Sequence, residues 1–233
     1  MSIRVEAVAA KKIGFASHQN AVPVIRELII HNQSDDEYQD VVLTLTASPP
    51  VVEDKIWKID RLTAQSELFV RDRDLKLNAS WLADLMESVT GELIFTLSRG
   101  DEVLLITGYP IELLAKNEWG GDAMVELTSA FVMPNDPAVD KLLKATSEVL
   151  RRAGKPDQLD GYTSNSRTRT WELASAVWSA IANTKLTYAL PPASFERIGQ
   201  KIRTPGVVME GQVATCLDTS LLFASVLEQL GLN

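Results

Sequence analysis

The single cysteine of the chain, Cys216, stands where a nucleophile is expected. It follows Thr215, a good helix N-cap, and precedes a long apolar run, so it would occupy the first position of a helix. Unpaired backbone amides and the positive end of the helix dipole favour a thiolate over a thiol there. The alternative interpretation is a small core residue, because free cysteines often pack as hydrophobes.

Acyl transfer by a thiolate also needs a base and donors for an oxyanion. Both histidines, His18 and His31, lie far before Cys216 in the chain, and we expect them in surface or edge-strand roles. Asp218 has the spacing of a helix cap rather than that of a catalytic acid. The side chain of Gln212 and the backbone amide of Cys216 are the candidate oxyanion donors.

Composition sets limits on function. The 233 residues are 45% hydrophobic and carry a net charge of −8, with a pI of about 4.9. An acidic chain of this kind does not neutralise phosphate backbones or anionic lipid, so we expect no direct binding of nucleic acid or membrane. One cysteine excludes an internal disulfide framework and a multi-thiolate zinc site, and is typical of the reducing cytoplasm.

Targeting and cofactor motifs are missing from the sequence. The first residues have no apolar signal-peptide core, and no apolar run approaches the roughly 20 residues of a membrane span. The phosphate-binding pattern G-x-x-x-x-G-K-[ST] is also missing, so we expect no ATP site and no cofactor. The sequence therefore predicts a cytoplasmic protein without a motor of its own.

The first half of the chain reads as short strands separated by turns. Alternating apolar and polar residues indicate sheets with one buried face, and seven or eight strands within about 115 residues are typical of an immunoglobulin-like β-sandwich. A short helix over 80–87, capped by Asn78 or Ser80, interrupts them. We expect Trp57 in the core or at a sheet edge, with a partner-binding anchor as the alternative. The expected strands are 3–8, 22–31, 41–46, 56–59, 67–75, 92–97, 103–107 and 111–114.

After residues 117–122 the apolar period changes from two to about 3.6, which predicts a second, helical domain. We assign 1–116 to the sandwich, 117–136 to a linker and 137–233 to the helical region, an α+β fold overall. Asp136 begins one helix and Gly154 ends it; a second covers 167–183, and a third begins at Cys216 and is apolar all round. We expect Trp171 and Trp178 on the buried stripe of the second helix.

Three blocks carry a family resemblance. Residues 134–143 (PNDPAVDKLL), 188–205 (YALPPASFERIGQKIRTP) and 215–233 (TCLDTSLLFASVLEQLGLN) together resemble the N-terminal, DUF4011-type region of large bacterial superfamily 1 DNA-helicase-related proteins. The β-rich half is similar only in pattern and in the NEWGG boundary. The resemblance implies that an ATP-driven helicase motor lies in the remainder of the same polypeptide.

The cysteine helix itself resembles the transglutaminase-like branch of the papain-like fold. That resemblance implies that Cys216 is the nucleophile, followed in the chain by a histidine and an aspartate on a sheet. Both histidines precede Cys216 here, and Ala214 stands where relatives have glycine. The expectation is the truncated, helical front half of such a domain, inactive alone and prone to self-association through its uncovered helices.

Two functions follow from the resemblance. The first is an accessory or regulatory module of a helicase-related protein, with protein docking through the sandwich. The second is part of a cysteine-dependent hydrolase or acyltransferase in which Cys216 uses a downstream histidine and aspartate. A third reading keeps the fold as an interaction scaffold in which Cys216 is a relic.

Overall fold

The computed structural model describes residues 3–232, which form an α+β fold. The chain divides into two compact units, Met1–Lys116 and Asn117–Asn233. Each unit has its own hydrophobic core. The segment 117–136, interpreted from sequence as a linker, belongs to the second unit and carries a strand and a 3-10 helix. Its Trp119 is buried, which is why the segment is part of a folded unit rather than a spacer.

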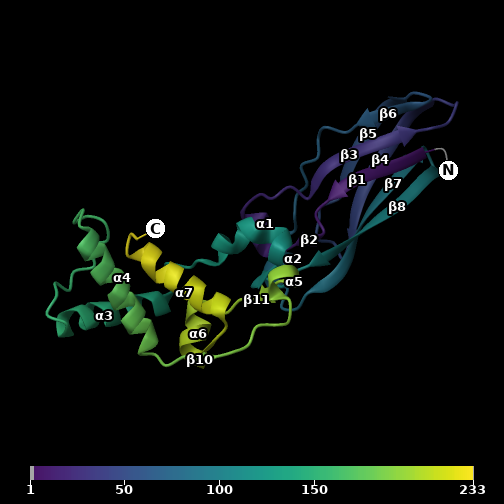
Figure 1. Ribbon diagram of the computed structural model, residues 1–233. Coiled ribbons are helices and arrows are strands. Elements are labelled where there is room, and N and C mark those ends of the chain that lie inside the picture. Colours follow the sequence, from purple (N-terminus) through teal and green to yellow (C-terminus); the bar gives the residue numbers. More distant parts are fainter. Residues whose placement is uncertain (1–2, 233) are drawn as a thin grey trace. The chain divides into compact units, whose positions relative to one another are not determined.

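The first unit contains two sheets that share one core (Figure 1). The smaller has the order β1-β3-β6 and the larger β2-β8-β7-β4-β5. All neighbours are antiparallel except β2 and β8, which are parallel. The strands and the two short helices of this unit are β1 (Ile3–Ala9), β2 (Lys12–Ile13), α1 (Phe15–Gln19), β3 (Ile25–Asn32), β4 (Tyr38–Ser48), β5 (Lys55–Leu62), β6 (Ser66–Phe69), α2 (Ala79–Asp84), β7 (Val89–Arg99) and β8 (Glu102–Leu113).

Alternation places the core of this unit, as the sequence predicts. In β4 the buried residues are two apart, and Leu43 pairs with Leu97 of β7, and Leu45 with Phe95. All four side chains are fully buried. The predicted helix near residue 80 is confirmed as α2, whose cap Asn78 accepts a hydrogen bond from the Trp81 amide.

The strand prediction differs from the structure at a proline. The sequence predicts two strands at 103–107 and 111–114, but residues 103–113 belong to the single strand β8, which ends at Leu113. Pro110 does not break the strand. Residues two apart in a strand direct their amides to the same side, and the Glu112 amide donates to the Lys11 carbonyl on the side of β8 away from β7. The N–H that Pro110 lacks therefore falls outside the β7–β8 ladder.

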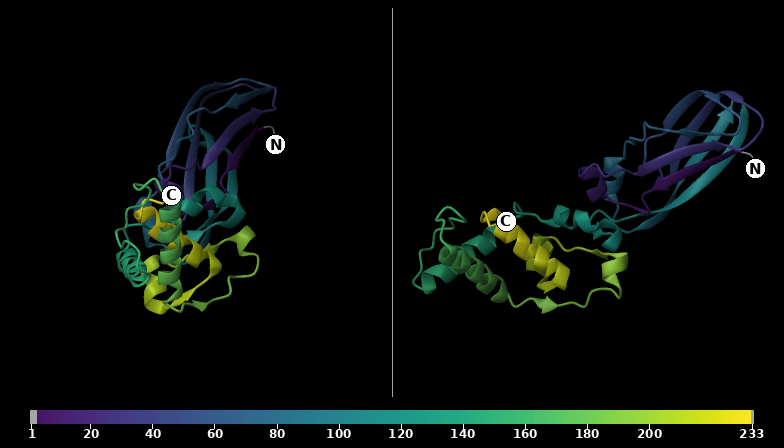
Figure 2. Two further views of the ribbon diagram at one scale, coloured as in Figure 1. Left: turned by 60° about the vertical axis from the view of Figure 1, so that its left-hand side comes forward. Right: turned by 45° about the horizontal axis from the view of Figure 1, so that its top comes forward.

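The second unit is mainly helical (Figure 2). Three of its caps are those predicted: Asp136 accepts from the Ala138 amide at the start of α3, Gly154 has a positive φ just after α3, and Thr215 begins α7. The elements of this unit are β9 (Glu118–Trp119), η1 (Gly121–Phe131), α3 (Pro137–Arg152), α4 (Arg167–Ala182), β10 (Thr187–Tyr188), α5 (Phe195–Ile198), β11 (Gln200–Lys201), α6 (Pro205–Gly211), β12 (Val213–Ala214) and α7 (Cys216–Gln229).

The prediction of two core tryptophans in α4 is wrong. Trp171 is 74% exposed and Trp178 65% exposed, whereas Leu173 and Val177 are fully buried. At 3.6 residues per turn the tryptophans lie on nearly the opposite side of the helix from Leu173 and Val177. Ala176 and Ala180 share the buried side with Leu173 and Val177, and α3 and α7 pack against α4. Periodicity alone did not distinguish the two apolar faces.

Helix α7 is not buried all round. Its inner face contains Leu221, Leu222 and Val226, which are buried, while Phe223 and Leu227 are half-buried. The polar Ser225 shares this inner face and has hydrogen-bond partners. The Ser225 hydroxyl donates to the Leu221 carbonyl and accepts from the Met133 amide, which ties the end of η1 to α7.

Candidate functional site

The thiol of Cys216 is exposed at the first position of α7. The capping box that precedes the helix is complete: the Thr215 hydroxyl accepts from the Asp218 amide at 3.2 Å, and an Asp218 carboxylate oxygen accepts from the Thr215 amide at 2.9 Å. This pair fixes the backbone on both sides of Cys216. The predicted position of the cysteine is therefore confirmed, and the buried-core alternative is wrong.

Asp218 is fully buried and has three hydrogen bonds. Besides the Thr215 amide, its carboxylate accepts from the backbone amide of Arg203 at 2.8 Å and from the Arg203 guanidinium at 2.9 Å. A buried carboxylate needs such partners. Asp218 thus caps α7, as its spacing indicates. It also links α7 to the segment before α6, because the guanidinium of Arg203 is paired with this carboxylate.

Two glutamines lie near α7 in different roles. Gln212, the predicted oxyanion donor, is an exposed residue with φ of 51° that ends α6. Gln200, not singled out from sequence, is buried and donates from Nε2 to the Thr215 hydroxyl at 3.0 Å. Its Oε1 is buried without a hydrogen-bond partner among residues 3–232. The amide next to the cap of the cysteine helix is therefore that of Gln200.

Neither histidine belongs to the unit that contains Cys216. His31 lies on β3, the central strand of the smaller sheet, where its ring nitrogens face Glu67 at 3.0 Å and Glu6 at 3.4 Å. His18 lies in α1 and stacks loosely on Phe15, with ring centroids 6.2 Å apart. His31 is thus a cross-strand partner of acidic residues, on a central strand rather than an edge.

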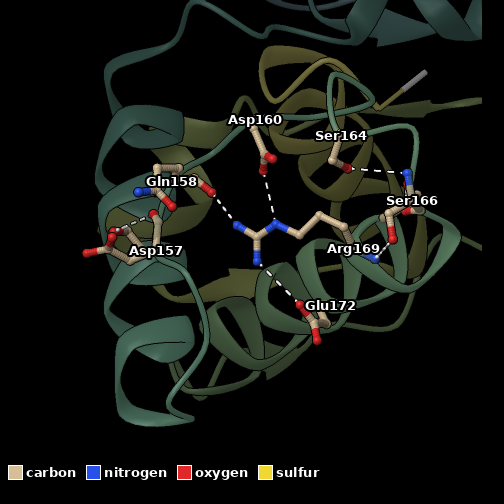
Figure 3. Close-up of polar contacts among 9 residues, drawn as sticks. Asp157, Gln158, Asp160, Ser164, Ser166, Arg169 and Glu172 are labelled. Atoms are coloured by element: carbon tan, nitrogen blue, oxygen red, sulfur yellow. Dashed lines mark hydrogen bonds and ion pairs between the residues drawn. The ribbon is translucent and has the colours of Figure 1, made fainter.

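Another buried charge in the second unit is Arg169, near the start of α4 (Figure 3). Its guanidinium donates to Asp160 at 3.0 Å, to Glu172 at 3.4 Å and to the Gln158 carbonyl at 2.5 Å. All three guanidinium nitrogens are used, so Arg169 fastens the α3–α4 loop to α4. Glu172 also contacts Lys155 at 2.8 Å, and this hydrogen bond holds the pKa of Glu172 below its ordinary value. No signal in the sequence marked this cluster.

Two hollows differ in what lines them. One of about 690 Å³ lies in the first unit beside β1 and β8, where the Tyr109 hydroxyl accepts from the Ala7 amide and donates to the Val5 carbonyl. The tyrosine thus occupies the outer hydrogen-bonding groups of β1. A second of about 260 Å³ lies in the second unit and is lined by Trp178, Phe223 and their neighbours.

Comparisons with known proteins leave the family open. No protein-family model matches the chain, and no curated protein matches it. Across residues 3–232, no group of three His, Cys, Asp or Glu side chains is placed to hold a metal ion. Within the same range, no helix is long and apolar enough to cross a bilayer.

Proposed function

We propose that this chain works by docking proteins, as the accessory N-terminal module of a bacterial DNA-helicase-related protein. The helicase part of the proposal rests on the three sequence blocks at 134–143, 188–205 and 215–233. In this proposal the motor, in the remainder of the polypeptide, hydrolyses ATP and contacts nucleic acid. The acidic charge of the present chain agrees with that division of labour.

The observation that carries the docking function is the exposed aromatic face of α4. Trp171 and Trp178 are one heptad apart and both project from the outer side of a helix whose inner side is already packed. Leu190, further along the chain, is 84% exposed. Large exposed apolar residues mark interaction surfaces, and tryptophan dominates the energetics of protein interfaces.

We also infer that the first unit is an immunoglobulin-like sandwich. In the letters used for immunoglobulin strands, the smaller sheet β1-β3-β6 corresponds to A-B-E. The larger sheet β2-β8-β7-β4-β5 corresponds to A′-G-F-C-C′, and its A′ strand, β2, runs parallel to β8. This order is that of the immunoglobulin class, in which C′ extends the G-F-C sheet. The helix α2 then spans the connection between strands E and F.

For the second unit we propose the helical front half of a transglutaminase-like domain. The support is the capped helix α7, which begins at an exposed cysteine and buries one apolar face.

The test begins with the polypeptide in its own cells. An affinity tag fused before residue 1 allows the tagged product to be purified and its mass and ATP hydrolysis to be measured. We expect a product far larger than 25.7 kDa that hydrolyses ATP when DNA is present. Removal of residues 1–233 should leave this ATP hydrolysis intact but abolish the cross-links to protein partners. A tagged product without ATP hydrolysis would contradict the helicase proposal.

A second candidate function is favoured by the exposure of Cys216. In this candidate the thiolate attacks an acyl carbon, and a histidine and an aspartate from the following part of the polypeptide act as base and orienting residue. Iodoacetamide labelling and hydrolysis of acyl substrates test it in the full polypeptide, with Cys216→Ala as control. Turnover that disappears in Cys216→Ala would favour the enzyme over the docking module.

A further inference from the structure

One hollow in the second unit combines an apolar cavity, a free strand edge and a lone positive charge. We call it the Trp178 groove; it lies beside α4, α7 and β10, which Figure 1 labels. Its volume of about 260 Å³ is below that of pockets for whole cofactors and suits one bulky side chain. The residues that define it are Trp178, Ile181, Lys185, Leu186, Tyr188 and Phe223.

Two stacked aromatic rings form the apolar wall of the groove. The rings of Trp178 and Phe223 stack at 5.4 Å between centroids with an angle of 27° between their planes. Ile181 is buried behind them. An apolar side chain that enters the groove therefore meets preformed aromatic walls and displaces water from them.

The strand β10 offers its outer edge at the rim. The Thr187 amide donates to the Gln212 carbonyl at 2.8 Å, and the Ala189 amide to the Ala214 carbonyl at 2.9 Å. Tyr188 lies between them, so its N–H and C=O point away from β12, to the open side of β10. An extended chain can pair with these groups, as in other cases of strand addition.

The charge of the groove is that of Lys185 alone. No other lining residue is charged, and no ion pair of Lys185 occurs within the described range 3–232. This contrasts with Arg169 of α4, each of whose three guanidinium nitrogens donates a hydrogen bond within the unit. A free ammonium beside an apolar cavity complements a carboxylate.

We infer that the Trp178 groove binds an extended peptide segment of a protein partner in which a bulky apolar side chain is followed closely by an acidic one. The apolar side chain fills the cavity, the peptide backbone pairs with Tyr188, and the carboxylate meets Lys185. This inference rests on the proposed docking function and names the chemistry of the partner. Nucleic acid is disfavoured, because one cation neutralises too few phosphates for stable binding.

The experiment selects ligands from random displayed peptides of about twelve residues and measures their affinity for four variants. Trp178→Ala and Lys185→Glu alter the groove. Phe69→Ala and Lys144→Glu are matched controls, an exposed aromatic residue of β6 in the first unit and an exposed lysine of α3, both outside the groove and outside the aromatic face of α4. Because Lys185 is exposed, its substitution leaves folding unchanged even if Trp178→Ala weakens the fold.

We expect enriched peptides with a Leu, Phe or Trp within about two residues of Asp or Glu. Their affinity should fall at least about tenfold in Trp178→Ala and about fivefold in Lys185→Glu, and remain unchanged in both controls. Enriched peptides without an acid, or with equal affinity for all variants, would overturn the inference.

Two other occupants are separate outcomes of the same experiment. If the protein forms a dimer that dissociates in Trp178→Ala, a second copy of the chain fills the groove. If an oligothymidine binds wild type but not Lys185→Glu, the groove binds single-stranded nucleic acid. Either result overturns the peptide inference. If the selected peptides bind a different face, so that Trp178→Ala and Lys185→Glu do not weaken them, the groove is not the binding site, but the proposed docking function is retained. A thiol-dependent turnover without any peptide ligand refutes the docking function itself.

Discussion

The two faces of α4 look alike in sequence and do different work in the structure. The inner face buries Leu173 and Val177, and all three guanidinium nitrogens of Arg169 donate hydrogen bonds there, whereas the outer face exposes Trp171 and Trp178. Lys185, which follows the helix, has no ion pair in the described residues. The inner face combines aliphatic side chains with the small Ala176 and Ala180, and the two tryptophan rings are left for contacts outside the folded unit.

The largest expected effect separates these faces by stability. Leu173→Ala should lower the free energy of unfolding by about 2–5 kcal/mol, because it removes a fully buried side chain and leaves a cavity. Trp171→Ala should change it by about 0.5 kcal/mol or less, since most of that ring is already in water. Urea unfolding monitored by circular dichroism measures both, and a larger loss for Trp171→Ala would reverse our assignment of the faces.

Arg169→Met is expected to have the next largest effect. It should destabilise the second unit by about 2 kcal/mol, because Asp160, Glu172 and the Gln158 carbonyl lose a shared donor while a methionine still fills the volume. Lys144→Met, an exposed lysine of α3, is the control. Thermal unfolding within the error of wild type would mean that the Arg169 cluster adds nothing to the inner face.

The helix caps and the apolar periods of the sequence predicted where the helices α3, α4 and α7 of the second unit begin and end. The cap hydrogen bonds of Asp136, Thr215 and Asp218 span two or three residues, so they follow from spacing alone, whereas the bonds from Arg203 to Asp218 do not. The burial of the α4 tryptophans and the partners of Arg169 depend on segments far apart in the chain. A period identifies apolar faces but does not state which one a neighbouring helix covers.

The candidate site divides in the same way. The exposed position of Cys216 and the cap function of Asp218 followed from the local pattern, whereas Gln200 and Lys185 gave no signal. Gln200 reaches Thr215 only because β11 pairs with β9 and brings it beside α7. Because β9 and β11 are only two residues long, neither shows an alternating pattern in the sequence from which their pairing could be predicted.

Gln200→Met should have a small effect on stability. The substitution loses one hydrogen bond to Thr215 but also removes the buried Oε1 that has no partner among the described residues. These contributions oppose each other, so the free energy of unfolding should change by about 1 kcal/mol or less. Gln200→Ala is the comparison, because it adds a cavity. A loss in Gln200→Met as large as that in Gln200→Ala would show that Oε1 is satisfied in solution.

The smallest expected effect is the pH dependence of the Glu172 ion pair. Its pKa is lowered in the folded protein, chiefly by the hydrogen bond from Lys155. The ionised form is therefore stabilised by folding, and this stability is present above the ordinary pKa and is lost as the pH falls through the folded value. The difference in unfolding free energy between wild type and Glu172→Gln should shrink between about pH 5 and about pH 3. A difference that stays constant over this range would contradict the assignment.

The contrast between the faces of α4 is tested most directly by cross-linking from Cys216. Ala214 and Thr219, which precede and follow Cys216 in the sequence, line the Trp178 groove, so we expect a benzophenone on the exposed thiol to reach an occupant of the groove. The control is Cys216→Ala with Lys144→Cys, which carries the same label on α3. We predict that a selected acidic, apolar peptide cross-links from Cys216, that Trp178→Ala abolishes this product, and that Phe69→Ala, which changes an exposed aromatic residue of the first unit, leaves it intact. Equal cross-linking from both labels, or a product that survives in Trp178→Ala, would contradict a docking function for the outer face of α4.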